Sequence, residues 1–179
     1  HNGRRRQRQM CIRDRPNAES LTLAFWVRSN KTGTYTIFLN ETDNNRQNTQ
    51  TYTIDSADTW EKKVISFVPD TTGTITNDNG SSLYLHFILA AGSTYSSGTF
   101  TSNTWAATTQ ANRVPSSQAN IADSTSNEWY VTGVQLEVGS FDSTSIPSFP
   151  FESFENNLRK CQRYYYCLLY TSDAADDDH

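Results

Sequence analysis

Cysteine and histidine are scarce in this sequence, with only three of each among 179 residues. Four of the six lie in the terminal stretches, at His1, Cys11, Cys167 and His179. The interior keeps Cys161 and His86, too few for a disulfide framework or a zinc site. His86 lies in LYLHFIL, where alternation places it on the strand face opposite to Leu85 and Phe87. A single histidine in a strand is usually a surface residue, so the sequence offers almost no residues for a His-based catalytic triad.

Long apolar runs are also missing. No stretch approaches the roughly 18 to 20 apolar residues that a membrane-spanning helix needs, so we expect no membrane insertion. The N-terminal residues HNGRRRQRQMCIRDR carry arginine without an apolar stretch behind it, and this pattern does not predict a signal peptide.

Charge is sparse and unevenly distributed, with 15 Lys and Arg against 19 Asp and Glu. Six of the arginines fall within residues 1–15, whereas residues 167–179 carry four aspartates and no Lys or Arg. One interpretation of RRRQRQ is a basic arm that binds nucleic acid or a membrane surface. We favour a disordered end, because charge-biased termini without apolar residues do not fold, and we expect no nucleic-acid partner.

What the chain has in quantity is threonine, serine, asparagine and aromatic residues. Threonine and aromatic side chains favour a pleated, half-buried sheet. In SLTLAFWVR, apolar residues recur with a period of two, so that Leu21, Leu23, Phe25 and Val27 share one face. This segment therefore predicts a strand with one side in a core.

Five further segments predict strands: TYTIFLN, QTYTID, EKKVISFV, SLYLHFIL and EWYVTGVQLEV. TDNNRQN, between the first two of these, predicts a polar loop. SLYLHFIL and EWYVTGVQLEV are nearly apolar throughout, as expected for strands covered on two sides. Six strands without a long amphipathic helix among them predict an all-β fold, an antiparallel β-sandwich.

A segment of unusual length, residues 90–127, separates the last two strands. Long loops inside a compact domain are usually functional or partly ordered as extra strands. Tyr95, Phe100, Trp105 and Arg113 occur here among Ser, Thr, Asn and Gln. Aromatic faces that stack on sugar C–H groups, beside amides and guanidinium that meet the hydroxyls, would suit carbohydrate. The same aromatics could instead anchor the segment to the sheet; the two interpretations are equal for Trp105, and the anchor is favoured for Phe100.

The character of the chain changes after Gly139, where a proline-punctuated, extended run begins. From Glu152 to about Tyr165 the apolar residues have helical spacing, which predicts a short C-terminal helix for packing or assembly. The alternative is a tail that only a continuation of the chain would order.

Six carboxylates of the predicted sandwich could in principle include a glycosidase pair: Asp55, Asp58, Glu61, Asp123, Glu128 and Glu137. Nothing in their spacing distinguishes such a pair from solvated surface acids. We therefore expect a protein that is not an enzyme and has no catalytic residues.

The blocks LAFWVRSNKTGTYTIFL, YTIDSADTWEKKVISF, SNTWAA, WYVTGVQLEVGS, PFE and CQRYY occur in this order within residues 19–166. They resemble a β-sandwich domain, similar to carbohydrate-binding modules, of tail-fibre and virion proteins of tailed phages. The resemblance implies a jelly-roll-like sandwich that binds cell-surface glycans on a homotrimeric fibre, in the tail of an extracellular virion. Members of that family have further strands before LAFWV and continue past CQRYY, which implies a sandwich incomplete at its N-terminal side.

One position departs from the related sugar-binding modules, whose last strand ends in an Asp-Asp-Val type motif that helps to hold calcium. The corresponding residues here are Thr132, Gly133 and Val134, with only Glu137 nearby. Calcium prefers several oxygen ligands including carboxylates, so we expect no calcium and no other cofactor or metal.

Both ends of the chain resemble a different kind of sequence. MCIRDR near the start and LLYTSDAADD near the end look like translated remnants of sequencing adapters. We therefore expect disordered, non-native tails at residues 1–15 and 167–179. Between them we expect a β-sandwich domain at 16–146, then an extended segment and helix at 147–166 that lead to a missing continuation.

The favoured function is non-catalytic glycan binding for receptor recognition. The candidate glycan contacts are Trp60, Tyr95, Trp105 and Arg113. Two alternatives stay open: a purely structural fibre or capsid-decoration domain, and an accessory carbohydrate-binding module of a secreted polysaccharide hydrolase. Exposed aromatics in or beside a groove favour sugar binding, whereas buried aromatics favour a structural role.

Overall fold

The computed structural model describes residues 18–76 and 80–165. The tails expected at 1–15 and 167–179 lie outside the described residues, as does residue 166. The chain divides into two compact units, residues 1–146 and 147–179. In the described part of both units, no helix is long and apolar enough to span a bilayer.

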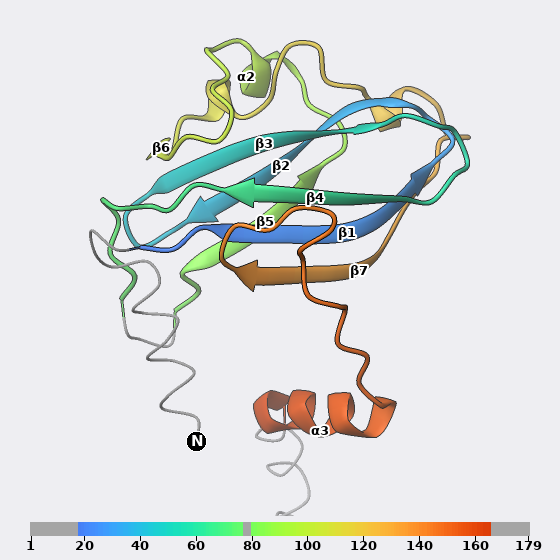
Figure 1. Ribbon diagram of the computed structural model, residues 1–179. Helices are drawn as coiled ribbons and strands as arrows, with labels where there is room; N and C mark the ends of the chain where they lie inside the picture. Colours follow the sequence, from blue (N-terminus) through green and yellow to red (C-terminus); the bar gives the residue numbers. More distant parts are fainter. Residues whose placement is uncertain (1–17, 77–79, 166–179) are drawn as a thin grey trace, which may run out of the picture. The chain divides into compact units, whose positions relative to one another are not determined.

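Two antiparallel sheets build the first unit (Figure 1). One sheet has the strand order β4-β1-β7, and the other has the order β5-β2-β3-β6. The strands are β1 (Leu21–Ser29), β2 (Gly33–Glu41), β3 (Arg46–Ile54), β4 (Glu61–Phe67), β5 (Leu83–Ile88), β6 (Ala106–Ala107) and β7 (Trp129–Val138). The predicted all-β sandwich is confirmed, all six predicted strands are present, and β6 is an additional short strand.

The inner faces of the two sheets form one hydrophobic core. Leu21, Leu23 and Val27 of β1 are buried in it beside Phe25, as the alternation predicted. From the four-stranded sheet the core receives Tyr35, Ile37, Leu39, Tyr52 and Ile54. The ring of Phe25 meets the rings of Tyr52 and Phe87 edge to face, at centroid distances of 5.2 and 5.1 Å. These contacts join the central strand of one sheet to the other sheet, in a geometry that aromatic pairs prefer.

The connection between β2 and β3 is shorter than the sequence predicted. TDNNRQN was expected to be a loop, but Arg46 begins β3 and pairs with Glu41 at the end of β2. Asn45 closes this hairpin with a φ of 53°, in the left-handed region that asparagine adopts more readily than most residues. The loop prediction was wrong because the first residues of β3 are polar although they lie in a strand.

The expectation that β5 and β7 are covered on both sides is also wrong, because alternate side chains of both strands are exposed. Each strand also lies at the edge of its sheet. In β7, Trp129 and Val131 pack against the core, whereas Tyr130 is 44% exposed on the other face. In β5, Phe87 packs against the core and Tyr84 is exposed. Apolar and aromatic side chains on the outer faces of these strands made the sequence look buried throughout.

A β-bulge interrupts the alternation of β7 at Gly133. Ala24 pairs with Gln135 and Trp26 pairs with Thr132, so two residues of β7 lie opposite one residue of β1. Gly133 has a φ of +59°, and a Cβ added there would lie 3.3 Å from Cδ1 of Trp26. Glycine is thus favoured both by its backbone conformation and by the indole that lies beside it.

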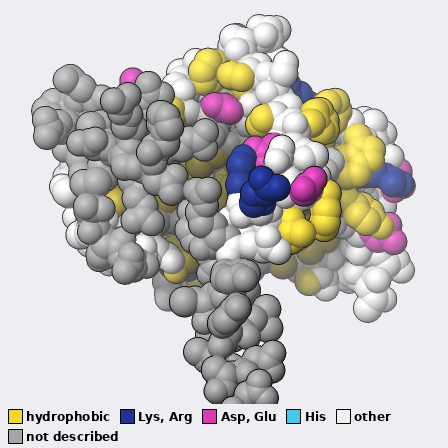
Figure 2. Space-filling view, turned by 90° about the horizontal axis from the view of Figure 1, so that it is seen from below, with side chains coloured by type: hydrophobic (Ala, Val, Ile, Leu, Met, Phe, Trp, Pro, Cys, Tyr) yellow, Lys and Arg dark blue, Asp and Glu magenta, His cyan; other side chains and the backbone are white. Residues whose placement is uncertain are grey.

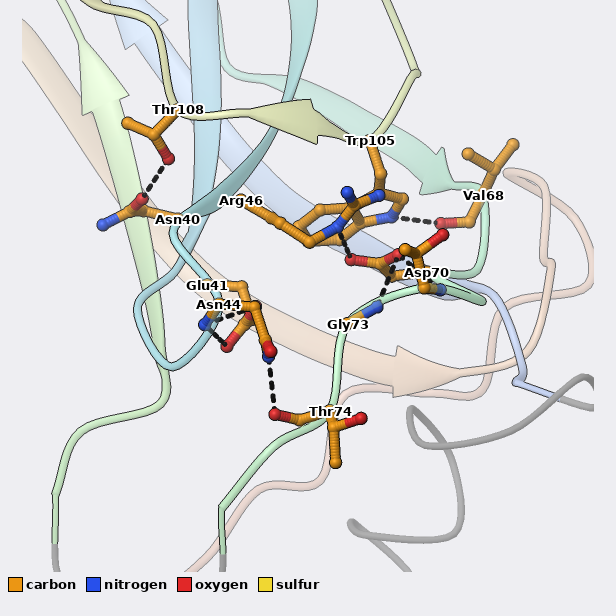
Figure 3. Close-up of polar contacts among 11 residues, drawn as sticks. Asn40, Glu41, Asn44, Arg46, Val68, Asp70, Gly73, Thr74, Trp105 and Thr108 are labelled. Atoms are coloured by element: carbon orange, nitrogen blue, oxygen red, sulfur yellow. Dashed lines mark hydrogen bonds and ion pairs between the residues drawn. The ribbon is translucent and has the colours of Figure 1, made fainter.

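One end of the sandwich interior is polar rather than hydrophobic (Figure 3). Arg46 Nε donates a hydrogen bond to Asp70 Oδ2 at 2.6 Å, and Asp70 also accepts from the backbone amides of Thr72 and Gly73. The carboxylate of Glu41 is buried close by. Burial raises the pKa of Asp70, but the Arg46 hydrogen bond and the two amides outweigh it, and the pKa lies below its ordinary value.

The second unit contains helix α3 (Phe154–Tyr165), whose first residue lies two positions after the predicted start at Glu152. Phe154 and Leu158 are exposed, and Phe151 before the helix is 92% exposed. Arg159 forms an ion pair with Glu155 one turn away. Figure 2 shows the molecule from below the view of Figure 1, and on this face hydrophobic side chains lie at the surface beside Lys, Arg, Asp and Glu.

Replacing Phe25 by Ala should lower the free energy of unfolding by about 3 to 5 kcal/mol, because it leaves a cavity between the sheets. Chemical denaturation followed by tryptophan fluorescence measures this change. Lys62→Ala, an exposed site on the neighbouring strand β4, is the control and should change the stability by less than about 0.5 kcal/mol. Equal effects of the two substitutions would contradict the described core.

Asp70 should contribute to the pH dependence of stability. The unfolded chain binds a proton at this aspartate near pH 3.9, whereas the folded protein binds it only at lower pH. The free energy of unfolding therefore falls as the pH falls from about 5 through the lowered pKa of Asp70. In Asp70→Asn this fall should be shallower, and stability at pH 7 should drop by about 3 to 5 kcal/mol because Arg46 loses its buried partner.

Urea denaturation at a series of pH values measures both effects. Asp55→Asn is a matched control, since Asp55 is exposed and bonds Lys63 at the surface. An Asp70→Asn protein with the parent's acid sensitivity would show that the buried pair does not control it.

Candidate ligand-binding site

The long segment at residues 90–127 is ordered, and its parts around Tyr95 and Arg113 lie over the outer face of the four-stranded sheet (Figure 1). It contains α2 (Ser93–Ser96), β6 and two short 3-10 helices, η1 (Gln110–Asn112) and η2 (Ile121–Asp123). Backbone hydrogen bonds attach it to β2, to β3 and to the turn between them: Ala119 to Thr34, Asn103 to Thr49 and Thr108 to Asn45. The short strand β6 also pairs with β3. In Figure 1, α2 lies on the side of β2 and β3 that faces away from β1 and β7.

A hollow of about 360 Å³ lies between this segment and the sheet. Its lining consists of Phe38, Asn40, His86, Ile88, Ala90, Ala91, Tyr95 and Arg113. Phe38 and His86 are directly opposite each other on the paired strands β2 and β5. Tyr95 comes from α2, and Arg113 directly follows η1. A backbone hydrogen bond from Val114 to the carbonyl of Tyr95 holds these two parts of the segment together.

Stacked side chains organise the hollow. The guanidinium carbon of Arg113 lies 4.8 Å from the ring centroid of Phe38 and 5.6 Å from that of Tyr95. Both distances fall within the range of cation–π attraction. On the sheet, the His86 ring lies 5.3 Å from the Phe38 ring and 5.9 Å from the Tyr84 ring. Arg113 is therefore held by two aromatic faces, and Tyr95 stays 37% exposed.

The hollow brings together two of the four predicted glycan contacts, Tyr95 and Arg113. The sequence did not indicate Phe38 and Tyr84, which belong to the same cluster of rings. His86 lies on the face away from Leu85 and Phe87, as the alternation predicted, but its place in the hollow was not foreseen. Strand alternation could have indicated this cluster, because it places Phe38, Tyr84 and His86 on the faces of their strands that point away from the core.

Trp60, a third predicted contact, lies elsewhere, directly before the first residue of β4, and does not line the hollow. Val27 of β1 pairs with Glu61, the residue after Trp60, and Arg28 follows Val27. Tyr130 lies on the other side of Arg28, whose guanidinium is 5.8 Å from the tyrosine ring. Trp60 is 42% exposed and Tyr130 44%. This aromatic face is separate from the hollow.

Trp105, the fourth predicted contact, is half-buried and packs against the hydrophobic core. Its Nε1 donates a hydrogen bond to the carbonyl of Val68 at 2.8 Å (Figure 3). These contacts fit the anchor interpretation of Trp105, because the indole attaches the long segment to the residues that follow β4.

The six carboxylates considered for a glycosidase pair all have partners in the sandwich, and none lines the hollow. Their partners are Lys63 for Asp55 and Glu61, Arg28 for Asp58, Lys31 for Asp123, Tyr130 for Glu128 and Gln135 for Glu137. For Asp123, the hydrogen bond from Lys31 is the main cause of a lowered pKa. Across the described residues, no group of three His, Cys, Asp or Glu is placed to hold a metal ion.

Comparison of the chain with protein-family models, with curated proteins and with solved structures found no match.

Trp105→Ala should lower the free energy of unfolding by about 3 kcal/mol, since it removes a large side chain that packs on the core. Trp105→Phe keeps most of the apolar contact and loses the bond to Val68, so its cost should be about 1 kcal/mol. Thermal and chemical denaturation measure both. A Trp105→Ala protein as stable as the parent would contradict the anchoring role.

Proposed function

We propose that the sandwich is a non-catalytic glycan-binding module and that the hollow over β2 and β5 is its binding site. One observation carries this proposal. Tyr95 and Arg113, from separate turns of the long segment, converge on Phe38 and His86 of the sheet around an open hollow. Polar groups placed among aromatic surfaces in a concave site are typical of small-molecule recognition.

The chemistry of this lining suits a sugar ring. A pyranose has apolar C–H faces and a rim of hydroxyl groups, so it needs an exposed aromatic face and hydrogen-bonding groups beside it. Tyr95 offers a partly exposed ring, and Asn40, His86 and Arg113 offer polar groups around it. The backbone bonds that fix the long segment reduce the ordering cost of binding, since the side chains are already close to one another.

The wider biological role rests on the resemblance of the sequence blocks. We propose recognition of a cell-surface glycan by a homotrimeric tail fibre or related virion protein, outside the cell. The exposed Phe151, Phe154 and Leu158 of the second unit are compatible with a segment that packs in a larger assembly. Trp105 is half-buried against the core, so this residue supports a structural role and not sugar binding. Tyr95 remains accessible, so the sugar-binding proposal still stands for the hollow.

Glycan-array binding and saturation-transfer NMR with the full chain test the proposal. Tyr95→Ala should weaken binding by at least about tenfold, equivalent to 1.4 kcal/mol, since it removes the stacking face. Tyr130→Ala is the matched control, a similarly exposed tyrosine on the opposite sheet, and should leave binding unchanged. Absence of binding to any glycan would contradict the function, and a loss in Tyr130→Ala instead of Tyr95→Ala would contradict the assigned site.

A further inference from the structure

We infer that the hollow selects acidic sugars, whose carboxylate or sulfate group pairs with Arg113. This inference rests on the proposed glycan-binding function and names the class of sugar.

The first step is the charge of Arg113. Its guanidinium has no ion pair within the described part of the chain, and its Nε is buried without a hydrogen-bond partner. Three other arginines with described side chains each have an acidic partner: Arg28 with Asp58, Arg46 with Asp70 and Arg159 with Glu155. Arg113 thus differs from them, and a partly buried cation without an anion is costly unless a ligand supplies one.

The second step is the composition of the lining. All eight of its residues are described, and they include no Asp or Glu. Asn40 Oδ1 already accepts a hydrogen bond from the hydroxyl of Thr108, at 3.4 Å. The side-chain groups left for a ligand are therefore the Asn40 amide and the Arg113 guanidinium, which only donate, and the His86 imidazole and Tyr95 hydroxyl, which can donate or accept. The lining carries no negative charge, and Arg113 supplies a permanent positive one. A complementary ligand must be rich in acceptors.

The third step is the orientation of the guanidinium. Phe38 and Tyr95 lie against Arg113 at cation–π distances, so aromatic groups occupy the space over the guanidinium. Because Nε is buried, the two terminal Nη groups are what remain for a ligand, and their N–H bonds match the two oxygens of a carboxylate. Tyr95, which is 37% exposed, offers ring surface for the sugar that carries the acid, whereas Phe38 is nearly buried beneath Arg113. Charge and ring recognition are thus adjacent in one hollow.

The fourth step concerns the whole molecule, whose formal net charge is −4. The overall field does not attract anions, so an acidic ligand must be recognised locally by Arg113 rather than gathered by a basic surface. We therefore expect recognition of a single acidic sugar residue and not general affinity for polyanions.

Isothermal titration calorimetry with the full chain tests the inference, using short oligosaccharides of glucuronic acid and of glucose as probes. The parent protein should bind the acidic oligosaccharide at least about tenfold more tightly than the neutral one. Arg113→Gln should remove this preference and keep the weaker neutral binding, because Tyr95 is still present. Arg113→Lys should keep part of the preference, because it retains the charge and loses the planar fork.

Arg28→Gln is the matched control, an arginine that also contacts a tyrosine but lies on the other sheet, and should retain the full preference. Thermal unfolding of each variant verifies that it is folded. Titration with glucose 6-sulfate shows whether the site prefers a sulfate or a carboxylate. Tight binding of either acidic sugar supports the inference. Inorganic sulfate bound as tightly as the acidic sugars would overturn it, since the site would then recognise a free anion.

The outcomes separate the two proposals. If neither oligosaccharide binds and glycan arrays are also negative, the proposed function itself is wrong. If glucose and glucuronic acid oligosaccharides bind equally, the function stands and the acidic selectivity is wrong. A preference for acid that survives Arg113→Gln would overturn the role of this side chain.

Discussion

The packing of β1 against the four-stranded sheet is the contact on which the rest of the molecule depends. β1 is hydrogen-bonded on both sides, to β4 and to β7, so it fixes the three-stranded sheet. The ring of Phe25 on β1 lies edge to face against the rings of Tyr52 and Phe87, which belong to strands β3 and β5. Tyr52 is further held by a hydrogen bond from Trp129 Nε1 of β7, and burial raises the pKa of its phenol. Both sheets thus meet at one aromatic cluster, and the opposite faces remain available for other uses.

The four-stranded sheet uses its outer face to hold the long segment. Phe38 is nearly buried on that face, although its neighbours Ile37 and Leu39 point into the core. Arg113 covers Phe38, and Tyr95 in turn lies over Arg113. The hollow is therefore a consequence of how the segment is attached. Backbone hydrogen bonds to β2 and β3 fix its path, and that path brings two distant side chains to one point.

The alternation of β1 predicted which of its residues enter the core, because a strand with one buried face has a clear period of two. The sandwich itself was predicted from six such segments together with the family resemblance. The same rule failed at β7, where the bulge at Gly133 shifts the alternation and large side chains lie on the exposed face. Composition indicated Tyr95 and Arg113 as candidates, but only the fold brings them over Phe38 and His86. Phe38 is more than 50 positions from both Tyr95 and Arg113, and no local pattern encodes a contact over that distance. Trp105 illustrates the converse, since an indole in a polar segment can equally be an anchor or a ligand contact.

The attachment of the long segment separates two properties of the molecule. It is connected to β2 and β3 by main-chain hydrogen bonds and by side chains such as Gln47, which bonds the backbone of Thr109, and Trp105 adds an anchor outside the hollow. None of these bonds uses the side chain of Tyr95 or Arg113. Side chains at positions such as 95 and 113 can thus be exchanged without touching the interior. Substitutions at these two positions would therefore change the surface of the hollow and leave the aromatic cluster between the sheets in place.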